Sequence, residues 1–371
     1  MYVGVLWSIG GNLPHLLQRF TSHSRAICSV LHAGLARGHR GNPAASLRVE
    51  QLYGIPVLLS CTASLLLKQT EFKQLDAYFK KKLIGPMKLY DLTSDSVVYF
   101  LAGSLPASAL LHIRQLGLFC MISRVPNNIL HRIAKHVLIT ARDNSKSWFI
   151  HIKSLCQQCS LPHPLLLLDS PLTKIAAKKL IKAKVTDFWE KKLRHESSLL
   201  PSLTYFKPSF MSLTSPHPIW TTCQDNSFEL SKCLIQSKLL SGRYRTDRLL
   251  RHFDKNVTGD CSLCLNGSDG SLEHLLVLCP ALTQCRDQQF LRLNTHPGIS
   301  DKARSIIAAS SQKSVPDFTQ LLLDCSVIPE VIEASQNSLT DIISDIFKFT
   351  RTWCFNVHMQ RMKMLGRFTK L

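Results

Sequence analysis

Acidic residues are scarce in this sequence. Its 371 residues include 25 aspartates and glutamates against 45 lysines and arginines, which gives a formal net charge of +20. No two aspartates are adjacent, and the acidic residues are scattered along the chain. Because enzymes that use a pair of magnesium ions hold them with clustered carboxylates, the sequence predicts no two-metal polymerase or nuclease centre in this chain.

Motifs of several other enzyme classes are missing as well. The chain has no H-E-x-x-H, no G-x-S-x-G and no phosphate-binding G-x4-G-K-[ST]. A zinc deaminase needs H-x-E followed later by P-C-x-x-C, whereas here a C-x-x-C precedes the histidine. We therefore expect a chain that is not an enzyme by itself and that has no small-molecule substrate.

Long apolar runs are absent too. The longest, Pro56 to Leu67, is interrupted by three polar residues and is shorter than the roughly 20 residues that span a bilayer. The first residues, MYVGVLWSIGG, lack the basic start and the small-residue cleavage site of a secretory signal. These features predict an intracellular chain, nuclear or cytoplasmic, without a membrane-spanning segment.

Cysteines and positive charge, in contrast, are plentiful. The 13 cysteines are odd in number and scattered, which favours metal ligands and buried free thiols over a disulfide framework. The excess of lysine and arginine predicts a polyanionic partner, with RNA or DNA first and an anionic membrane surface second. A charged surface that only keeps the chain soluble is the plainer interpretation.

The hydrophobic spacing predicts a mainly α fold. We expect β structure only in YVGVLW, residues 2–7, a strand without a partner in the rest of the chain. Helix boundaries follow from glycine and proline: Gly54 and Pro56 interrupt the helix that opens at Pro43, and Pro126 breaks another. The expected helices span residues 13–35, 43–53, 57–67, 71–84, 106–141, 174–194 and the stretch from about 339 onward.

Composition divides the chain into four parts. A helical, thumb-like region at 1–195 is followed by a linker at 196–220 that is rich in proline and serine. Residues 221–294 hold the cysteine–histidine segment, and 295–371 form a C-terminal helical region, of which 295–316 read as loop-like. We thus expect a small, helical, zinc-knuckle-containing domain after the thumb-like region.

Residues 261–280, CSLCLNGSDGSLEHLLVLCP, have the spacing C-x2-C-x9-H-x4-C. A C-x-x-C turn can place two thiolates on one ion, and Pro280 disfavours helix at Cys279, which lets the chain turn back toward the metal. The predicted zinc ligands are Cys261, Cys264, His274 and Cys279. Four protein ligands leave no open position, so this Zn²⁺ would be structural.

Other assignments of these cysteines stay open. The outer spacings match a retroviral-type zinc knuckle, but the middle gap is longer than in that knuckle and shorter than the gap of about twelve in a C2H2 finger. Reduced cysteines beside a helical histidine are the plainer alternative. Cys156, Cys159 and His163 form a second, weaker C-x-x-C group without a fourth ligand, and Cys285 or the more distant Cys233 could substitute as a ligand.

Two basic stretches are candidates for contact with nucleic-acid phosphates. One is the predicted helix 174–194, with an apolar side and a basic side, and the other precedes the first cysteine pair, where three arginines spaced by three would share a helix side. Both stretches could equally be solvated surface. The candidate nucleic-acid-binding residues are Lys178, Lys179, Lys182, Lys184, Arg243, Arg245, Arg248 and Arg251.

Several stretches resemble the C-terminal part of non-LTR (LINE-type) retrotransposon reverse transcriptases. The most specific is SKLLSGRYRTDRLLRHFDKNVTGDCSLCLNGSDGSLEHLLVLCPAL, which is similar to their cysteine–histidine segment. ARGHRGNPAASLRVEQLYGIPVLLS and SLPASALLHIRQLGLFCMISRVP resemble their thumb side. LLLDCSVIPEVI and FKFTRTWCFNVHMQR resemble their far C-terminal end, and MYVGVLW resembles the strand near the primer grip.

The resemblance implies a non-catalytic remnant of a retrotransposon polymerase that binds zinc and nucleic acid. In this family, the endonuclease and the palm with its paired aspartates would precede residue 1, so no catalytic residue carries over. The family implies that the cysteine–histidine segment holds RNA template and target DNA.

Two alternatives remain. One is a zinc-stabilised protein-interaction module that docks through Trp353 and Phe355. The other is an accessory part of an RNA-directed DNA polymerase whose palm is encoded upstream. The oligomeric state stays open.

Overall fold

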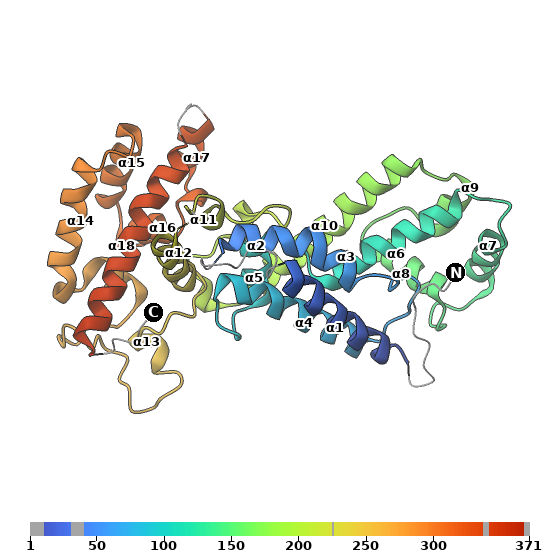
Figure 1. Ribbon diagram of the computed structural model, residues 1–371, viewed down its shortest axis with the longest axis horizontal. Coiled ribbons are helices and arrows are strands. Elements are labelled where there is room, and N and C mark those ends of the chain that lie inside the picture. Colours follow the sequence, from blue (N-terminus) through green and yellow to red (C-terminus); the bar gives the residue numbers. More distant parts are fainter. Residues whose placement is uncertain (1–10, 31–40, 225, 337–340, 367–371) are drawn as a thin grey trace.

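The computed structural model describes residues 11–30, 41–224, 226–336 and 341–366, and it is mainly α-helical (Figure 1). Within these ranges the β structure is a single bridge between Asp260 and Asp269. The mainly α prediction is therefore confirmed. The strand predicted at 2–7 lies outside the described residues.

The first helices are α1 (Leu13–Val30), α2 (Pro43–Val49), α3 (Ile55–Leu58) and α4 (Gln69–Met87). The predicted interruption at Gly54 and Pro56 is wrong, because a π-helical turn, Glu50–Gly54, joins α2 to α3 without a break. Gly54 instead permits close packing on α1. A Cβ there would lie 2.7 Å from His23 Nε2, which is itself 2.5 Å from the Glu50 carboxylate.

Two further boundaries differ from the prediction. The stretch 57–67 is helical only to Leu58, and beyond it Leu65 and Leu67 are buried at alternate positions, as in extended chain. Helix α4 does not stop before Gly85 and Pro86 but continues to the buried Met87, although Pro86 removes one hydrogen bond of the helix, and it ends at Lys88 in the left-handed conformation (φ 50°).

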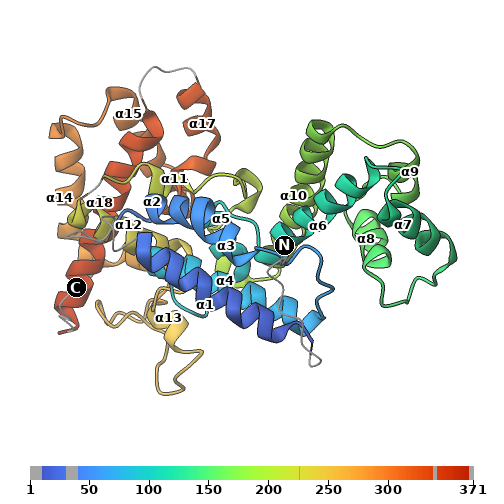
Figure 2. The same cartoon turned by 45° about the vertical axis from the view of Figure 1, so that its right-hand side comes forward.

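Helices of the middle third are α5 (Asp95–Ala102), α6 (Ala107–Ser123), α7 (Ile129–Thr140), α8 (Trp148–Gln158), α9 (Pro164–Asp169) and α10 (Lys174–Ser198). The break predicted at Pro126 and the long basic helix are both confirmed. Helix α10 lies along α6, and α7, α8 and α9 gather at one end of the elongated molecule (Figure 2).

The proline- and serine-rich stretch 196–220 is packed rather than extended. It contains two short 3-10 turns, and it leads into α11 (Pro218–Thr221). Its apolar side chains, among them Phe206 and Trp220, are buried. The backbone N–H of His217 also donates to Leu101 O in α5, so this stretch ties the middle third to the C-terminal helices.

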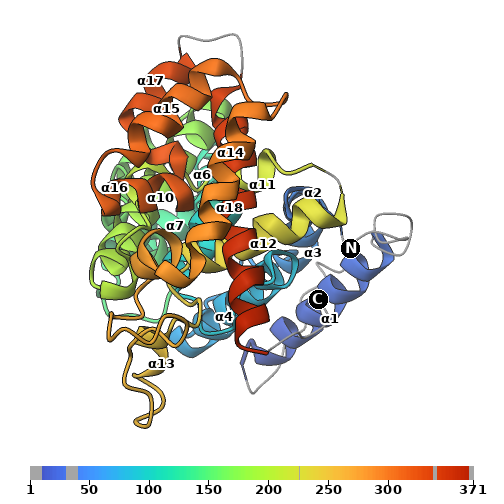
Figure 3. The same cartoon turned by 90° about the vertical axis from the view of Figure 1, so that its left-hand side faces the viewer.

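The C-terminal helices are α12 (Ser227–Leu240), α13 (Asp247–Leu250), α14 (Thr283–Thr295), α15 (Asp301–Ser311), α16 (Val315–Leu323), α17 (Pro329–Gln336) and α18 (Ile342–Met364). The loop-like reading of 295–316 is wrong, since Ala303 and Ile307 bury one side of α15. Helix α18 contacts α12, α14, α15, α16 and α17 and forms the centre of this group (Figure 3). Its Trp353 and Phe355 are buried, so they cannot form the docking face considered above.

No single described helix combines the length and apolar character that crossing a membrane requires. The bent pair α5 and α6 meets that test only when the two helices are taken together.

Candidate metal centre

The cysteine–histidine segment begins with a tight loop that places the first two cysteines. The Cys261 N–H donates to Ser268 O, and the Gly270 N–H donates to Gly259 O, which closes a small antiparallel loop. At its tip, Leu265 N–H donates to Cys261 O in a turn. Gly270 is needed because a Cβ would lie 2.7 Å from the Asp247 Cβ. The C-x-x-C pair is therefore held by backbone bonds.

A π-helical turn, His274–Leu278, places the other two candidate ligands. The Cys279 N–H donates to His274 O at 2.6 Å, an i→i+5 bond that brings residue 279 back over residue 274. Cys279 then leaves the helical conformation (φ −57°, ψ 117°), as expected for a residue before proline. The predicted unwinding at Cys279 is confirmed.

The four predicted ligands meet at one point. Cys261 Sγ lies 3.7 Å from Cys279 Sγ, and Cys264 Sγ lies 3.4 Å from His274 Nε2. One ligand atom from each residue lies within 4.8 Å of the others, and among the described residues no other group of histidine, cysteine and carboxylate side chains converges in this way. The cluster can hold a metal ion.

Burial sets the protonation of the cluster without a metal. Cys261, His274 and Cys279 are buried, while Cys264 is half-buried. Burial, with the neighbouring Cys261 adding to it, raises the pKa of the Cys279 thiol to about 12. Burial and then the charge of Arg286 lower the pKa of His274. The imidazole is thus neutral, as a ligand must be, and metal binding would release a proton from the Cys279 thiol.

Contacts from distant segments support this cluster. Asp247 accepts hydrogen bonds from the N–H and the hydroxyl of Ser262, between the first two cysteines, at 3.0 Å each. The same carboxylate pairs with the buried Arg361 of α18 at 3.3 Å. Trp353 Nε1 donates to Leu276 O in the π-helical turn. Both halves of the cluster are therefore attached to α18.

Sequence reasoning missed Asp247 and Arg361. A signal for Arg361 existed, because it follows the buried Cys354 and Val357 at helical spacing on the core side of α18. An arginine in that register indicates a buried partner. Asp247 gave no such signal, since its partners lie 15 and 114 residues away in the sequence.

The other cysteine candidates are placed differently. Cys156 and Cys159 are buried, and burial raises the pKa of their thiols to about 12 and about 11. His163 accepts a hydrogen bond from Leu165 N and so caps α9. Cys233 lies 3.4 Å from Arg351 Nη1, in the core beside α18, and Cys285 is half-buried on α14. None of them belongs to the converging group.

Helix α10 presents the predicted lysines as a surface. Its buried side consists of Ala177, Ile181, Val185, Trp189 and Leu193, four residues apart. Lys178, Lys179 and Lys182 are exposed and Lys184 is half-buried. In the described part of the chain, these four have no carboxylate partner, whereas Lys191 pairs with Asp187.

The predicted arginines do not share one helix side. Helix α13 covers only Asp247–Leu250, so Arg243 and Arg245 precede it, and Arg251 is its C-cap. Arg248 pairs with Asp269 at 3.0 Å on the surface of the loop formed by residues 259–270, the metal loop. Arg245 and Arg251 are exposed and Arg243 is half-buried. The arginines therefore lie before, within and just after the short helix α13, and they do not form a stripe along one helix side.

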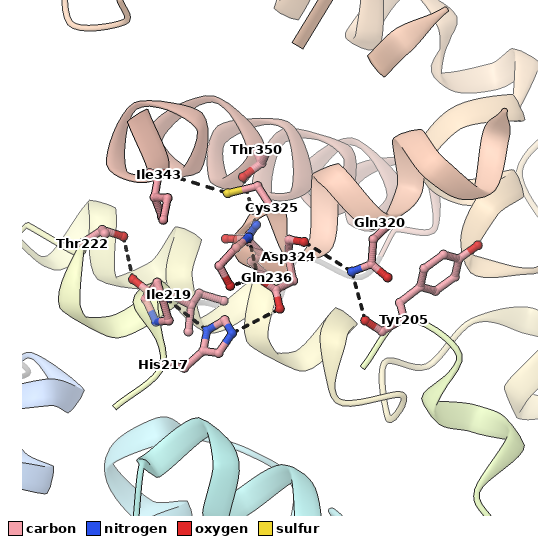
Figure 4. Close-up of polar contacts among 12 residues, drawn as sticks. Tyr205, His217, Ile219, Thr222, Gln236, Gln320, Asp324, Cys325, Ile343 and Thr350 are labelled. Atoms are coloured by element: carbon pink, nitrogen blue, oxygen red, sulfur yellow. Dashed lines mark hydrogen bonds and ion pairs between the residues drawn. The ribbon is translucent and has the colours of Figure 1, made fainter. Parts of the chain in front are cut away.

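A second polar cluster is buried between α11 and α16 (Figure 4). His217 Nδ1 accepts from Ile219 N, so its Nε2 carries the proton and donates to Asp324 Oδ2 at 3.2 Å. Asp324 also accepts from the N–H and hydroxyl of Ser326. Gln236 donates to Leu322 O and to the Thr350 hydroxyl. These bonds join α11, α12, α16 and α18.

Comparison of the chain with protein-family models, with curated protein sequences and with solved structures finds no match.

Proposed function

We propose that the cysteine–histidine cluster binds one structural Zn²⁺. In a tetrahedron with zinc–sulfur bonds of about 2.3 Å and zinc–nitrogen bonds of about 2.05 Å, sulfur atoms lie about 3.8 Å apart, and sulfur and nitrogen about 3.5 Å apart. The distances of 3.7 Å between Cys261 and Cys279 and 3.4 Å between Cys264 and His274 fit these edges. Three thiolates and one imidazole favour zinc over harder cations.

We propose further that the chain binds nucleic acid and is similar in this to the C-terminal part of non-LTR retrotransposon reverse transcriptases. The observation that carries this proposal is the row of exposed lysines on α10, Lys178, Lys179 and Lys182, without a carboxylate partner in the described chain. Unpaired cations on a chain of net charge +20 attract phosphates. Contacts of this kind position RNA or DNA without reading its sequence.

A salt titration tests nucleic-acid binding. Affinity for a fluorescent single strand, measured by anisotropy in increasing NaCl, falls with a slope of about −0.7 for each phosphate neutralised. Removing Lys178 and Lys182 with alanine should flatten the slope by about 1.4. The matched control replaces Lys81 and Lys302, two exposed lysines outside α10, and should leave the slope nearly unchanged. An affinity that is independent of salt would refute phosphate contact.

By itself this chain would not synthesise DNA. No two aspartates are adjacent in it, and the resemblance lies with regions outside the catalytic palm. Purified chain should extend no primer on an RNA template. Incorporation that depends on the template and is lost with EDTA would contradict this part of the proposal.

A protein-interaction module is the second candidate, and one observation favours it. Helix α7 exposes Ile129, Leu130, Ile133 and Ile139, each more than 40% accessible. Apolar side chains in such number on one short helix are typical of a contact surface. Binding of a partner through α7 would be insensitive to salt, which distinguishes it from phosphate contact.

A further inference from the structure

A cavity of about 360 Å³ lies beside α13, the short helix that is hydrogen-bonded to the metal loop. One wall is the segment after α4, with Tyr90, Asp91 and Leu92, and the other is formed by residues 243–253 around α13. Leucine and aromatic side chains dominate the lining, and Leu92 and Phe253 are 74% and 69% exposed at its edge. Exposed apolar side chains around a cavity are typical of a site that binds a ligand or a partner.

The charge around this cavity is positive. Arg243 and Arg245 belong to its lining, and within the described chain neither guanidinium has a carboxylate partner. Lys238 Nζ lies 5.5 Å from the centre of the Tyr90 ring. Burial and then the charge of Lys88 lower the pKa of Lys238, so further cations lie nearby. Asp91 is the acidic residue of the lining.

An apolar cavity bordered by cations fits an aromatic group that is attached to an anion. A nucleobase in a single strand has this chemistry, because its ring stacks on aromatic side chains while its flanking phosphates pair with arginine. A lone apolar side chain of a peptide would leave the guanidinium groups without a role. A base inside a duplex is stacked on both faces and cannot enter.

We propose that this cavity takes one unstacked base of single-stranded nucleic acid. Tyr90 and Phe253 supply the stacking faces, and Arg243 and Arg245 contact the adjacent phosphates. The inference rests on the proposed nucleic-acid binding and adds to it a site for a base. It involves different residues from the lysines of α10.

The metal loop supports one wall of the cavity. The Arg248 N–H donates to Gly270 O, and Asp247 accepts two hydrogen bonds from Ser262. Both residues precede Leu249 and Leu250, which line the cavity. An ordered metal loop therefore fixes α13, and metal binding should strengthen base binding.

Abasic oligonucleotides test this inference. Full-length protein is titrated with a fluorescent ten-nucleotide single strand and with the same strand carrying abasic sites at its central positions. One stacked base contributes about 1–3 kcal/mol, so the intact strand should bind about 5- to 150-fold more tightly. Phe253→Ala should remove most of this preference and leave the salt slope intact. The control Phe210→Ala removes a phenylalanine of similar exposure outside the cavity and should change neither.

The outcomes separate the two proposals. Equal affinity for both strands with a steep salt slope would overturn the base site and leave nucleic-acid binding standing. No binding to either strand would overturn both. If Phe253→Ala does not fold, the Tyr90→Leu variant takes its place in the test, because leucine keeps the cavity wall apolar and removes only the aromatic ring. It should then show the same loss of preference for the intact strand. A Phe253→Ala variant with unchanged base preference but altered sedimentation would assign the cavity to a second copy of the chain and overturn the inference.

Discussion

At the scale of single residues, the chemical nature of the side chain matters most for the four candidate ligands and for Asp247, the carboxylate that holds their loop in place. A serine in place of a ligand keeps the volume but offers zinc a much poorer donor. Asp247 acts differently, because it is not one of the four candidate ligands but binds the chain between Cys261 and Cys264. Substitutions at the two kinds of position should therefore have separable effects on metal content and stability.

Cys279→Ser should abolish stoichiometric zinc, which elemental analysis of purified protein would measure. Because metal binding is coupled to local folding and is worth roughly 10–16 kcal/mol in zinc-finger peptides, residues 255–285 should also loosen. Cys156→Ser changes an equally buried cysteine and should leave zinc at one per chain. If instead Cys156→Ser loses the metal, the group at Cys156 and Cys159 is the metal site.

Asp247→Ala should destabilise the protein by about 3–5 kcal/mol, because it leaves Arg361 buried without its ion-pair partner. Arg361→Met should cost less, since Asp247 would keep the two hydrogen bonds from Ser262. Urea denaturation of both variants measures the difference. Equal losses for the two variants would mean that the ion pair, which both variants remove, accounts for the effect, and that the unpaired charge of Arg361 and the Ser262 hydrogen bonds add little.

At the scale of helices, close packing and buried polar caps position the elements. Helix α1 approaches the π-helical turn Glu50–Gly54 at a glycine, and α11 joins α16 through His217 and Asp324. In both places the contact connects residues that are distant in the sequence.

Gly54→Ala should destabilise the N-terminal helices by about 1–3 kcal/mol, because the added Cβ would lie 2.6 Å from Glu50 Oε1 and 2.7 Å from His23 Nε2. Gly117 in α6 is the matched control, since no atom beyond its own stretch of helix backbone lies within 4 Å of a Cβ there. Gly117→Ala should stabilise by about 0.5–1 kcal/mol through helix propensity. Thermal denaturation monitored by circular dichroism compares them, and a stabilising Gly54→Ala would contradict the packing described here.

Asp324 should make stability depend on pH in the acid range. Burial alone opposes its ionisation, but His217 and the hydrogen bonds from Ser326 outweigh burial and lower the pKa of Asp324 below its usual 3.8. The unfolded state therefore binds this proton more tightly, so the contribution to stability is present above about pH 4 and is lost as pH falls further. Urea midpoints between pH 7 and pH 3 should fall less in Asp324→Asn than in the wild type.

At the scale of the whole molecule, the segment 261–279, which carries the cysteine–histidine cluster, and the basic helix α10 lie in different helical groups (Figure 1). Helix α10 packs on α5 and α6, whereas the cluster is attached to α18. Metal removal should consequently affect the two basic regions unequally.

Chelation with EDTA should increase hydrogen exchange strongly in residues 247–282 and weakly in α6–α10. The reason is that the ligands hold the loop and the π-helical turn, while α10 depends on its own apolar side. Added Zn²⁺ should restore protection. Uniform deprotection across the chain would show instead that the metal controls the global fold.

Local features of the sequence were sufficient for much of this picture. The mainly helical class, the break at Pro126, the basic helix α10 and the turn of the chain at Cys279 each depend on residues a few positions apart. The four candidate ligands also lie within nineteen consecutive residues, 261–279. Short spacings constrain geometry directly, because a turn or a helix relates near neighbours in a fixed way.

Only the tertiary structure decided the features that join distant segments. Asp247 meets Arg361 across 114 residues, and Trp353 is buried on Leu276 instead of being available to a partner. The cavity between Tyr90 and Phe253 likewise exists only because two separate segments meet. Gly54, read as a helix breaker, proved to be a packing residue once α1 lay against it. Such pairings depend on how helices pack, and no short-range spacing encodes which surfaces will meet.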